Sequence, residues 1–163
     1  MVKLGIQLKA ILENVTEFMP ENPPSFGWCF RVKCTQCGDE HSNSVFVSAD
    51  DENELQGSRG SSNFVMHCTF CRKHNMSIDI IKYNPYNDAD SETWKTILEV
   101  EFRNLEPIAF LVEGEWTCQS TQSSKLFEGI KSADLSEGWY DYDDVGMAEV
   151  SITEIETKII KLK

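Results

Sequence analysis

Apolar and polar residues alternate through much of the chain. Near the N-terminus, apolar residues occupy every second position from Leu4 to Leu12, and the other face carries the polar residues Lys3, Gln7, Lys9 and Glu13. This period of two is typical of a half-buried strand. The same alternation marks 28–33 and 94–103, and shorter runs predict further strands at 45–48, 64–67 and 77–82. The pattern therefore predicts a mainly β protein.

The C-terminal segment 147–162 is ambiguous, because its charged residues could decorate a helix. Its β-branched residues favour one long strand instead. Prolines and glycines interrupt the chain at intervals that suit a multi-stranded sheet system and not a helical bundle: Pro20, Pro23, Pro24, Gly57, Gly60, Pro85, Pro107, Gly114, Gly129 and Gly138.

A faint duplication is visible in the sequence. The segment 12–15, Leu-Glu-Asn-Val, resembles the segment 102–105, Phe-Arg-Asn-Leu, and Gly27-Trp28 resembles Gly138-Trp139. Self-similarity of this kind indicates repeated structural units. We expect a single domain over 1–163, composed of two pseudo-symmetric halves at about 1–84 and 92–163.

Two Cys-x-x-Cys pairs supply four thiols, Cys34 with Cys37 and Cys68 with Cys71. Zn²⁺ prefers four such sulfur ligands in a tetrahedron. The pairs are further apart than the roughly 15 to 20 residues of a compact zinc ribbon. Loop entropy grows slowly with length, whereas a structural zinc site contributes roughly 10 to 16 kcal/mol of apparent binding energy. The four cysteines, all in the first half, therefore predict one Zn²⁺ site.

Charge and composition narrow the classes of partner. Twenty-seven carboxylates face fifteen Lys and Arg side chains, a net charge of −12, which repels nucleic acid and anionic membranes. The N-terminus lacks the apolar core of a secretory signal, and no apolar run is long enough to span a bilayer. We expect a cytoplasmic protein, in whose reducing compartment paired cysteines hold metal more often than they form disulfides.

The chemistry of the four thiols still has alternatives. Four thiolates leave no open coordination position, so the ion is expected to be structural and not catalytic. A thiol-redox role is the alternative, and the basic residues 72–74 would favour a thiolate at Cys71. The histidines His41, His67 and His74 are expected beside the site and not in it. Cys29 and Cys118 lie in strand-like surroundings and are expected in the core or at a strand edge.

Three other features have weaker interpretations. The segment Gly57–Gly60 could bind an anion through its backbone, but a turn that returns the chain toward the second Cys pair is the preferred interpretation. The run 139–144, with one Trp, two Tyr and three Asp, could dock a basic partner. Alternatively, Trp139 is buried in the core and the aspartates face water. No hydrolase motif is found, which leaves catalysis without a candidate residue.

The sequence resembles the eukaryotic CXXC motif-containing zinc-binding proteins along nearly its whole length. The segments that carry the resemblance occur in the order of that family: 8–14, 33–38, 57–61, 68–71, 85–87, 103–107 and 139–143. The resemblance implies a β-rich fold of two pseudo-symmetric halves with one Zn²⁺ bound by Cys34, Cys37, Cys68 and Cys71. It implies no reaction.

The expected function is accordingly that of a zinc-stabilised, non-enzymatic adaptor whose partner is another protein. Neither nucleic acid nor a membrane is an expected partner, and the chain is expected to be a monomer. The alternative is a metal-handling or thiol-redox protein that uses the same four cysteines.

Overall fold

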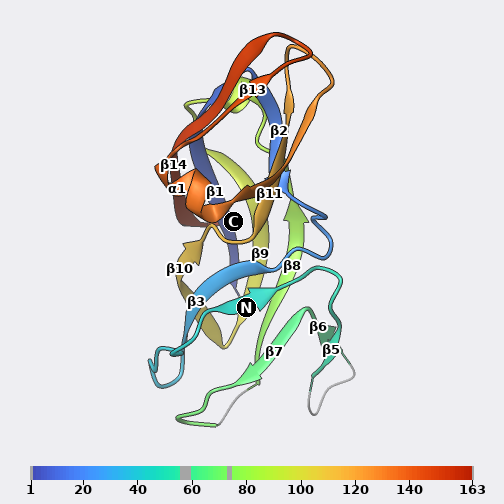
Figure 1. The fold of residues 1–163 in the computed structure, drawn as a ribbon. Coiled ribbons are helices and arrows are strands. Elements are labelled where there is room, and N and C mark those ends of the chain that lie inside the picture. The colour runs from blue at the N-terminus through green and yellow to red at the C-terminus, as the bar shows by residue number, and fades with distance from the viewer. Residues whose placement is uncertain (1, 56–59, 73–74, 163) are drawn as a thin grey trace.

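The computed structural model describes residues 2–55, 60–72 and 75–162 (Figure 1). Strands form 61% of the protein and helix 6%, so the prediction of a mainly β fold is confirmed. The strands are β1 (Val2–Glu13), β2 (Val15–Pro20), β3 (Trp28–Cys34), β4 (Val45–Val47), β5 (Asn53–Glu54), β6 (Ser61–Ser62), β7 (Phe64–His67), β8 (Asn75–Tyr83), β9 (Lys95–Arg103), β10 (Leu105–Leu111), β11 (Glu115–Ser120), β12 (Leu126–Lys131), β13 (Trp139–Asp143) and β14 (Ala148–Lys161). A 3-10 turn, η1 (Asp88–Asp90), and a short helix, α1 (Ser132–Glu137), complete the elements.

The strands form one large antiparallel sheet and three smaller ones. The large sheet has the order β13-β14-β1-β9-β8-β7. Two three-stranded sheets have the orders β10-β3-β4 and β12-β11-β2, and β5 pairs with β6. The two longest strands of the large sheet are β1, whose alternation was visible in the sequence, and β14, which the β-branched residues of 147–162 favoured.

The sheet orders contain a pseudo-twofold relation. Exchanging β1 with β9, β2 with β10, β3 with β11, β4 with β12, β7 with β13 and β8 with β14 reverses the large sheet onto itself and interchanges the two three-stranded sheets. The halves also exchange a strand, because β2 pairs with β11 and β10 pairs with β3. The two predicted pseudo-symmetric halves are thus interlocked and do not lie side by side as separate units.

Two asparagines mark equivalent points of the halves. Asn14 separates β1 from β2 with φ 56°, and Asn104 separates β9 from β10 with φ 64°, a left-handed conformation that asparagine tolerates well. The Asn14 side chain donates to the Glu149 carbonyl at 2.9 Å, and the Asn104 side chain donates to the Asn75 carbonyl at 2.8 Å. The strand order corrects one part of the expected duplication, since Trp139 begins the counterpart of β7 and is not equivalent to Trp28.

Aromatic side chains from both halves share one core. Trp28 from β3 and Trp116 from β11 are fully buried, with their rings edge to face and 6.1 Å between centroids. Phe18 stacks on Trp116 at 4.9 Å, and Phe26 contacts both tryptophans edge to face. Packing of this kind contributes beyond the area buried. The interlocked strands therefore enclose a continuous core.

Bulges account for strands that the alternation did not predict. Pro107 lies inside β10, at a register shift and on the outer strand of its sheet, where a missing N–H is tolerated. Gly129 lies inside β12 with φ 68°, a conformation that L side chains rarely adopt. Both residues were counted in the sequence among those that interrupt the chain. Of the helices in the described part of the chain, none has the length and hydropathy to cross a membrane.

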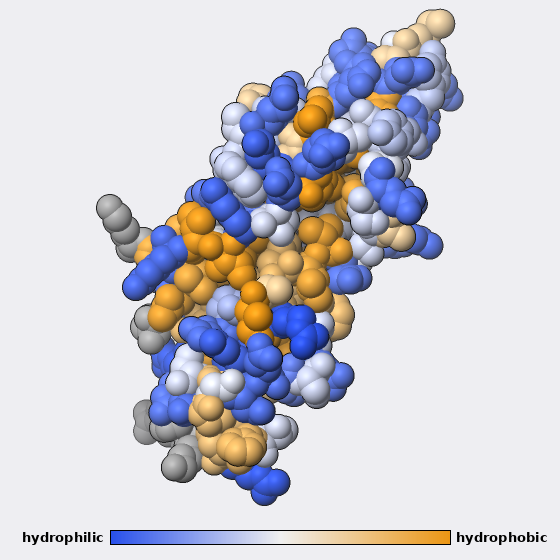
Figure 2. Space-filling model, turned by 90° about the vertical axis from the view of Figure 1, so that its left-hand side faces the viewer, coloured by the Kyte–Doolittle hydropathy of each residue, from blue (hydrophilic) through white to orange (hydrophobic). Residues whose placement is uncertain are grey.

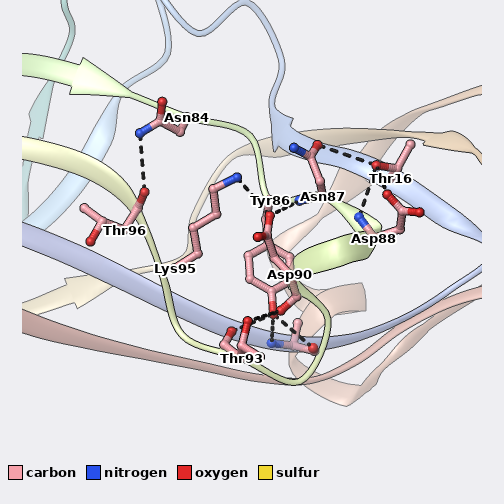
Figure 3. Close-up of polar contacts among 10 residues, drawn as sticks. Thr16, Asn84, Tyr86, Asn87, Asp88, Asp90, Thr93, Lys95 and Thr96 are labelled. Carbon is pink, nitrogen blue, oxygen red and sulfur yellow. Dashed lines mark hydrogen bonds and ion pairs between the residues drawn. The ribbon is translucent and has the colours of Figure 1, made fainter.

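The segment 84–94, between β8 and β9, is anchored by one tyrosine (Figure 3). Tyr86 is fully buried, and its hydroxyl lies 2.5 Å from the Asp90 carbonyl oxygen and 2.8 Å from that of Thr93. The Ala10 N–H donates to the same hydroxyl at 3.3 Å. Lys95 Nζ lies 2.8 Å from Asp90 Oδ2 and closes the segment. A single phenol thus organises the connection between the halves.

Replacing Tyr86→Phe should lower the free energy of unfolding by about 1 to 3 kcal/mol, because the buried polar groups around the hydroxyl lose their partner. Urea denaturation at constant zinc concentration measures this change. Tyr140→Phe is the matched control, since the Tyr140 side chain is 71% exposed and should tolerate the loss. Equal stability of the two variants would contradict the role given to the Tyr86 hydroxyl.

Candidate metal centre

The first Cys pair lies where β3 ends. Cys34 is the last residue of the strand, and the turn after it brings Cys37 back beside it. The Gly38 N–H donates to the Cys34 carbonyl at 2.9 Å, and Gly38 adopts φ 77°. The Cys34 N–H in turn donates to the Asp39 carbonyl at 2.9 Å. These bonds fold the pair into a tight knuckle.

The second pair repeats this arrangement after β7. The Arg72 N–H donates to the Cys68 carbonyl at 3.0 Å, and Arg72 has φ 54° at the position equivalent to Gly38. The Cys71 N–H points at the Cys68 sulfur, 3.5 Å away. Two knuckles of the same design therefore face each other across the gap between β3 and β7.

The geometry of the four sulfurs suits one tetrahedral ion. The Sγ atoms all lie within 4.8 Å of one another, with Cys34 to Cys71 at 3.8 Å and Cys37 to Cys68 at 3.6 Å. A tetrahedron with Zn–S bonds of about 2.3 Å has S···S edges of about 3.8 Å. A disulfide would bring two sulfurs to about 2.05 Å. The four side chains thus fit a zinc site.

The thiols differ in their tendency to ionise. The Cys71 N–H, helped by the Phe70 N–H and the neighbouring thiols, lowers the pKa of Cys68 to about 6 against the effect of burial. The Asp39 N–H lowers the pKa of Cys37, but burial and the neighbouring thiols outweigh it and raise the pKa to about 12. A cation that binds all four sulfurs must displace protons, so its affinity falls with falling pH.

Burial divides the cluster into an inner and an outer side. Cys34 and Cys68 are each 3% exposed, Cys71 is half-buried and Cys37 is exposed. His67 is exposed and does not belong to the cluster found among the described residues. The site therefore lies at the surface, with two of its sulfurs embedded in the core.

The remaining sequence candidates lie in three different places. His41 lines a small cavity of about 10 Å³ that Cys34 and Cys68 also line. His74 and residues 57–59 of the Gly57–Gly60 segment lie outside the described residues. Cys29 and Cys118 are each 2% exposed, in agreement with the core position expected of them. Burial raises the pKa of both thiols, in Cys118 to about 12, so neither is poised to react.

The second half contains a counterpart of this cluster that uses oxygen in place of sulfur. Cys34 pairs with Leu105 across β3 and β10, and Ser120 pairs with Val15 across the equivalent strands β11 and β2. The Ser120 N–H also donates to the carbonyl five residues later, as the Cys34 N–H does. Ser120 therefore takes the place of Cys34, and Ser123, with the same spacing, that of Cys37.

The counterpart of the second Cys pair follows from the two asparagine contacts. In the first half, the carbonyl of Asn75 accepts the bond from Asn104, and Asn75 pairs with His67 across β8 and β7. In the second half, the carbonyl of Glu149 accepts the bond from Asn14, and Glu149 pairs with Tyr142 across β14 and β13. The next residue is Cys68 in the first half and Asp143 in the second. The motif Cys-x-x-Cys thus becomes Ser-x-x-Ser at one position and Asp-x-x-Gly at the other.

A buried carboxylate joins these groups in the second half. Asp143 is fully buried, and its Oδ2 accepts from the Ser120 hydroxyl at 2.5 Å and the Ser123 hydroxyl at 2.7 Å. Its Oδ1 accepts from the Val145 and Gly146 N–H groups, both at 2.9 Å. Four donors satisfy the carboxylate, which is the condition for burying a charge. We call Asp143, Ser120 and Ser123 the serine–aspartate clasp.

The acidic run around Asp143 had been interpreted as a solvated surface or a docking face. Trp139 is buried, as the solvated-surface interpretation expected, but Asp143 does not face water. Burial raises the pKa of the Asp143 carboxyl, yet the Gly146 N–H, the two serine hydroxyls and the Val145 N–H outweigh it and hold the pKa far below its usual range. Only the Ser-x-x-Ser spacing, a very common pattern, could have indicated this site.

The interlocked β fold and its tetrahedral group of four thiols define a zinc-binding β protein held by two Cys-x-x-Cys knuckles. The family model for the eukaryotic CXXC motif containing zinc binding proteins matches residues 5–160, and the chain belongs to this family. The chain is 37% identical over 163 residues to the protein of that name in Xenopus laevis, with 99% of each covered. A UPF0587 protein of Schizosaccharomyces pombe is 35% identical over 161 residues, with 99% of each covered.

Two solved structures have the same fold. A crystal structure of C1orf123 matches with a TM-score of 0.87 and 34% identity, covering 98% of this chain and 99% of that one. A hypothetical protein from Plasmodium falciparum matches with a TM-score of 0.85 at 22% identity, over 98% of this chain and 99% of the other. The second likeness concerns the fold alone.

Replacing Asp143→Asn should lower stability at neutral pH and remove one source of acid sensitivity. A carboxyl whose pKa is depressed by folding stabilises above its unfolded pKa of about 3.9, and that contribution is lost as the pH falls toward the folded value. The stability difference between wild type and variant should therefore stay constant above about pH 5 and shrink below about pH 4. Thermal denaturation across this range measures the difference, and a pH-independent difference would contradict the assignment.

Proposed function

We propose that Cys34, Cys37, Cys68 and Cys71 bind one Zn²⁺ per chain, and that this ion is structural. The observation that carries the proposal is the set of four sulfurs within 4.8 Å of one another, with separations that fit a tetrahedron. The ion would join the end of β3 to the turn after β7. It would also neutralise thiolates that otherwise repel one another at close range.

The serine–aspartate clasp supports a structural role for the metal. At the equivalent place of the second half, internal hydrogen bonds join the end of β11 to the turn after β13. That connection contains only groups of the chain itself and has an evident structural use. A metal in the equivalent position is most simply understood as making the same connection.

The protein would then act as a non-enzymatic adaptor that binds another protein through its surface. Four thiolate ligands leave the ion no open position for substrate or water. The acidic surface charge disfavours nucleic acid and anionic membranes as partners. A monomer in the cytoplasm is the expected working form.

A metal-handling or thiol-redox function is the second candidate, and one observation favours it. Cys37 is exposed and Cys71 is only half-buried, so an acceptor or an oxidant could reach the outer side of the cluster. In this case the ion would exchange while the fold persists. Zinc binding alone does not separate the two functions, whereas the fate of the fold on metal loss does.

Purified protein should contain one zinc per chain. Chelation should release this zinc and reduce the near-UV circular-dichroism signal in parallel. Loss of a structural ion removes the link between the knuckles, because binding energy at such a site is folding energy. A chelator titration with simultaneous zinc and circular-dichroism readouts tests this. Complete zinc release with an unchanged spectrum would contradict a structural role and favour exchange.

Cys37→Ser offers a clean test of the ligand set, since an exposed side chain can be replaced without a packing cost. Changes beyond the direct ligands of a metal typically weaken binding about 10 to 100-fold, so loss of a direct ligand should weaken zinc binding by about 100-fold or more. Competition with a chromogenic chelator measures the affinity. Cys118→Ala is the control, because its buried sulfur lies outside the cluster and the variant should keep its zinc. Undiminished zinc affinity in Cys37→Ser would remove this residue from the site.

A further inference from the structure

One pair of equivalent surfaces is covered in the first half and left open in the second. After β8 the chain leaves the large sheet at Asn84, and the segment 84–94 crosses over β1 and β2, which η1 contacts (Figure 3). In the second half, β14 instead continues along β1 as far as Lys161. The surface of β10 that corresponds to the covered surface of β2 therefore receives no equivalent segment.

The covered surface makes specific contacts with the segment. The Leu12 N–H donates to Ser91 Oγ at 2.9 Å, and Thr16 Oγ1 donates to Asp88 Oδ1 at 2.9 Å. Phe18 and Tyr86 exchange two backbone hydrogen bonds, at 2.8 and 2.9 Å, as adjacent antiparallel strands do. Three residues of β1 and β2 thus hold the segment in an extended path.

The counterparts of these three residues line an open groove. Counting from Asn14 in one half and Asn104 in the other, Leu12, Thr16 and Phe18 correspond to Phe102, Glu106 and Ile108. All three line a groove of about 480 Å³, together with Leu4, Leu105 and Ile159. The groove thus occupies the place that the segment 84–94 fills in the other half.

The groove is apolar at its centre and offers one unpaired charge. Ile108 is 40% exposed. Figure 2 shows apolar side chains gathered in a band across the middle of the face on which β10 and β14 lie in Figure 1. Glu106 is paired with Lys33 at 3.1 Å, whereas Lys161, which also lines the groove, has no ion-pair partner among the described residues. An acidic group on an occupant would complement Lys161.

The backbone of β10 suits a further extended segment. β10 is the outer strand of its sheet, as β2 is of the other. Ile108 lies at a register shift between Pro107 and Ala109, and Phe18 lies at the equivalent shift between Thr16 and Met19. Outer strands are the usual places at which an extended peptide adds to a sheet.

We propose that this groove binds an extended segment of a partner protein, with one Tyr or Phe buried as Tyr86 is and an acidic residue following it toward Lys161. The occupant would pair with β10 at Ile108 as Tyr86 pairs with Phe18 on β2. Its acidic residue would lie beside Lys161 and not beside Glu106, the counterpart of the Thr16 that Asp88 contacts. The proposal rests on the proposed adaptor function and identifies the kind of partner that the adaptor recognises.

The chain supplies its own probe, a synthetic peptide with the sequence of residues 84–93. Added to isotope-labelled, zinc-loaded full-length protein, it should bind saturably and shift amide resonances of β10 and of the C-terminal end of β14. Changing its Tyr to Ala should weaken binding about tenfold or more, because loss of a buried aromatic ring costs at least about 1.4 kcal/mol.

Ile108→Glu should abolish binding, since it places a charge in the apolar centre of the groove. Ile81→Glu is the matched control, as Ile81 is 45% exposed on β8 and does not line the groove. Absence of saturable binding, equal binding by the two variants, or shifts centred on β2 would each overturn the inference. These results are independent of the zinc experiment. Zinc release with an intact fold would contradict the structural role of zinc. Failure of folded, zinc-loaded protein to bind the peptide would contradict only the proposal for the groove.

Discussion

Each half depends on one connection, between the end of a strand in a three-stranded sheet and a turn at the edge of the six-stranded sheet. In the second half, Asp143 makes it by accepting hydrogen bonds from two serines and two backbone N–H groups. In the first half, four thiols stand at the same place, too close together for all four to ionise without a cation. The strand exchange between β2 and β10 then carries each connection into the core of the other half.

The two connections respond to different conditions. The serine–aspartate clasp contains all of its donors and acceptors, so it needs nothing from solution and weakens only when the carboxyl is protonated. A four-thiolate site needs an ion, and its strength falls with chelation, oxidation and acid. The connection in the second half is therefore self-contained, whereas the connection in the first half depends on the metal, redox state and pH of the solution. A metal site confined to one half is consistent with zinc as a structural component, because the other half achieves the same connection without it.

Much of the fold was predictable where strands are long and uninterrupted. β1, β3 and β9 show clear alternation, β14 was assigned as a strand from its β-branched residues, and the two Cys-x-x-Cys pairs identified the thiol cluster before any contact was known. The strands β2, β10, β11, β12 and β13 and the two-residue strands β5 and β6 were missed. Bulges at Pro107 and Gly129 break the period in β10 and β12, and pairing between the halves is not local in sequence. The burial of Asp143 was not predicted for another reason. An aspartate in an acidic run is expected to be exposed unless its distant serine partners are known.

The most direct test of this account is amide hydrogen exchange on the full chain before and after zinc is removed. If zinc and the serine–aspartate clasp make equivalent but independent connections, removal should reduce protection most strongly at 32–41 and 66–72. Protection at 119–125 and 142–147 should largely persist. Equal loss at both places, or unchanged protection around the cysteines, would contradict the claim that the metal is the first half's counterpart of the clasp.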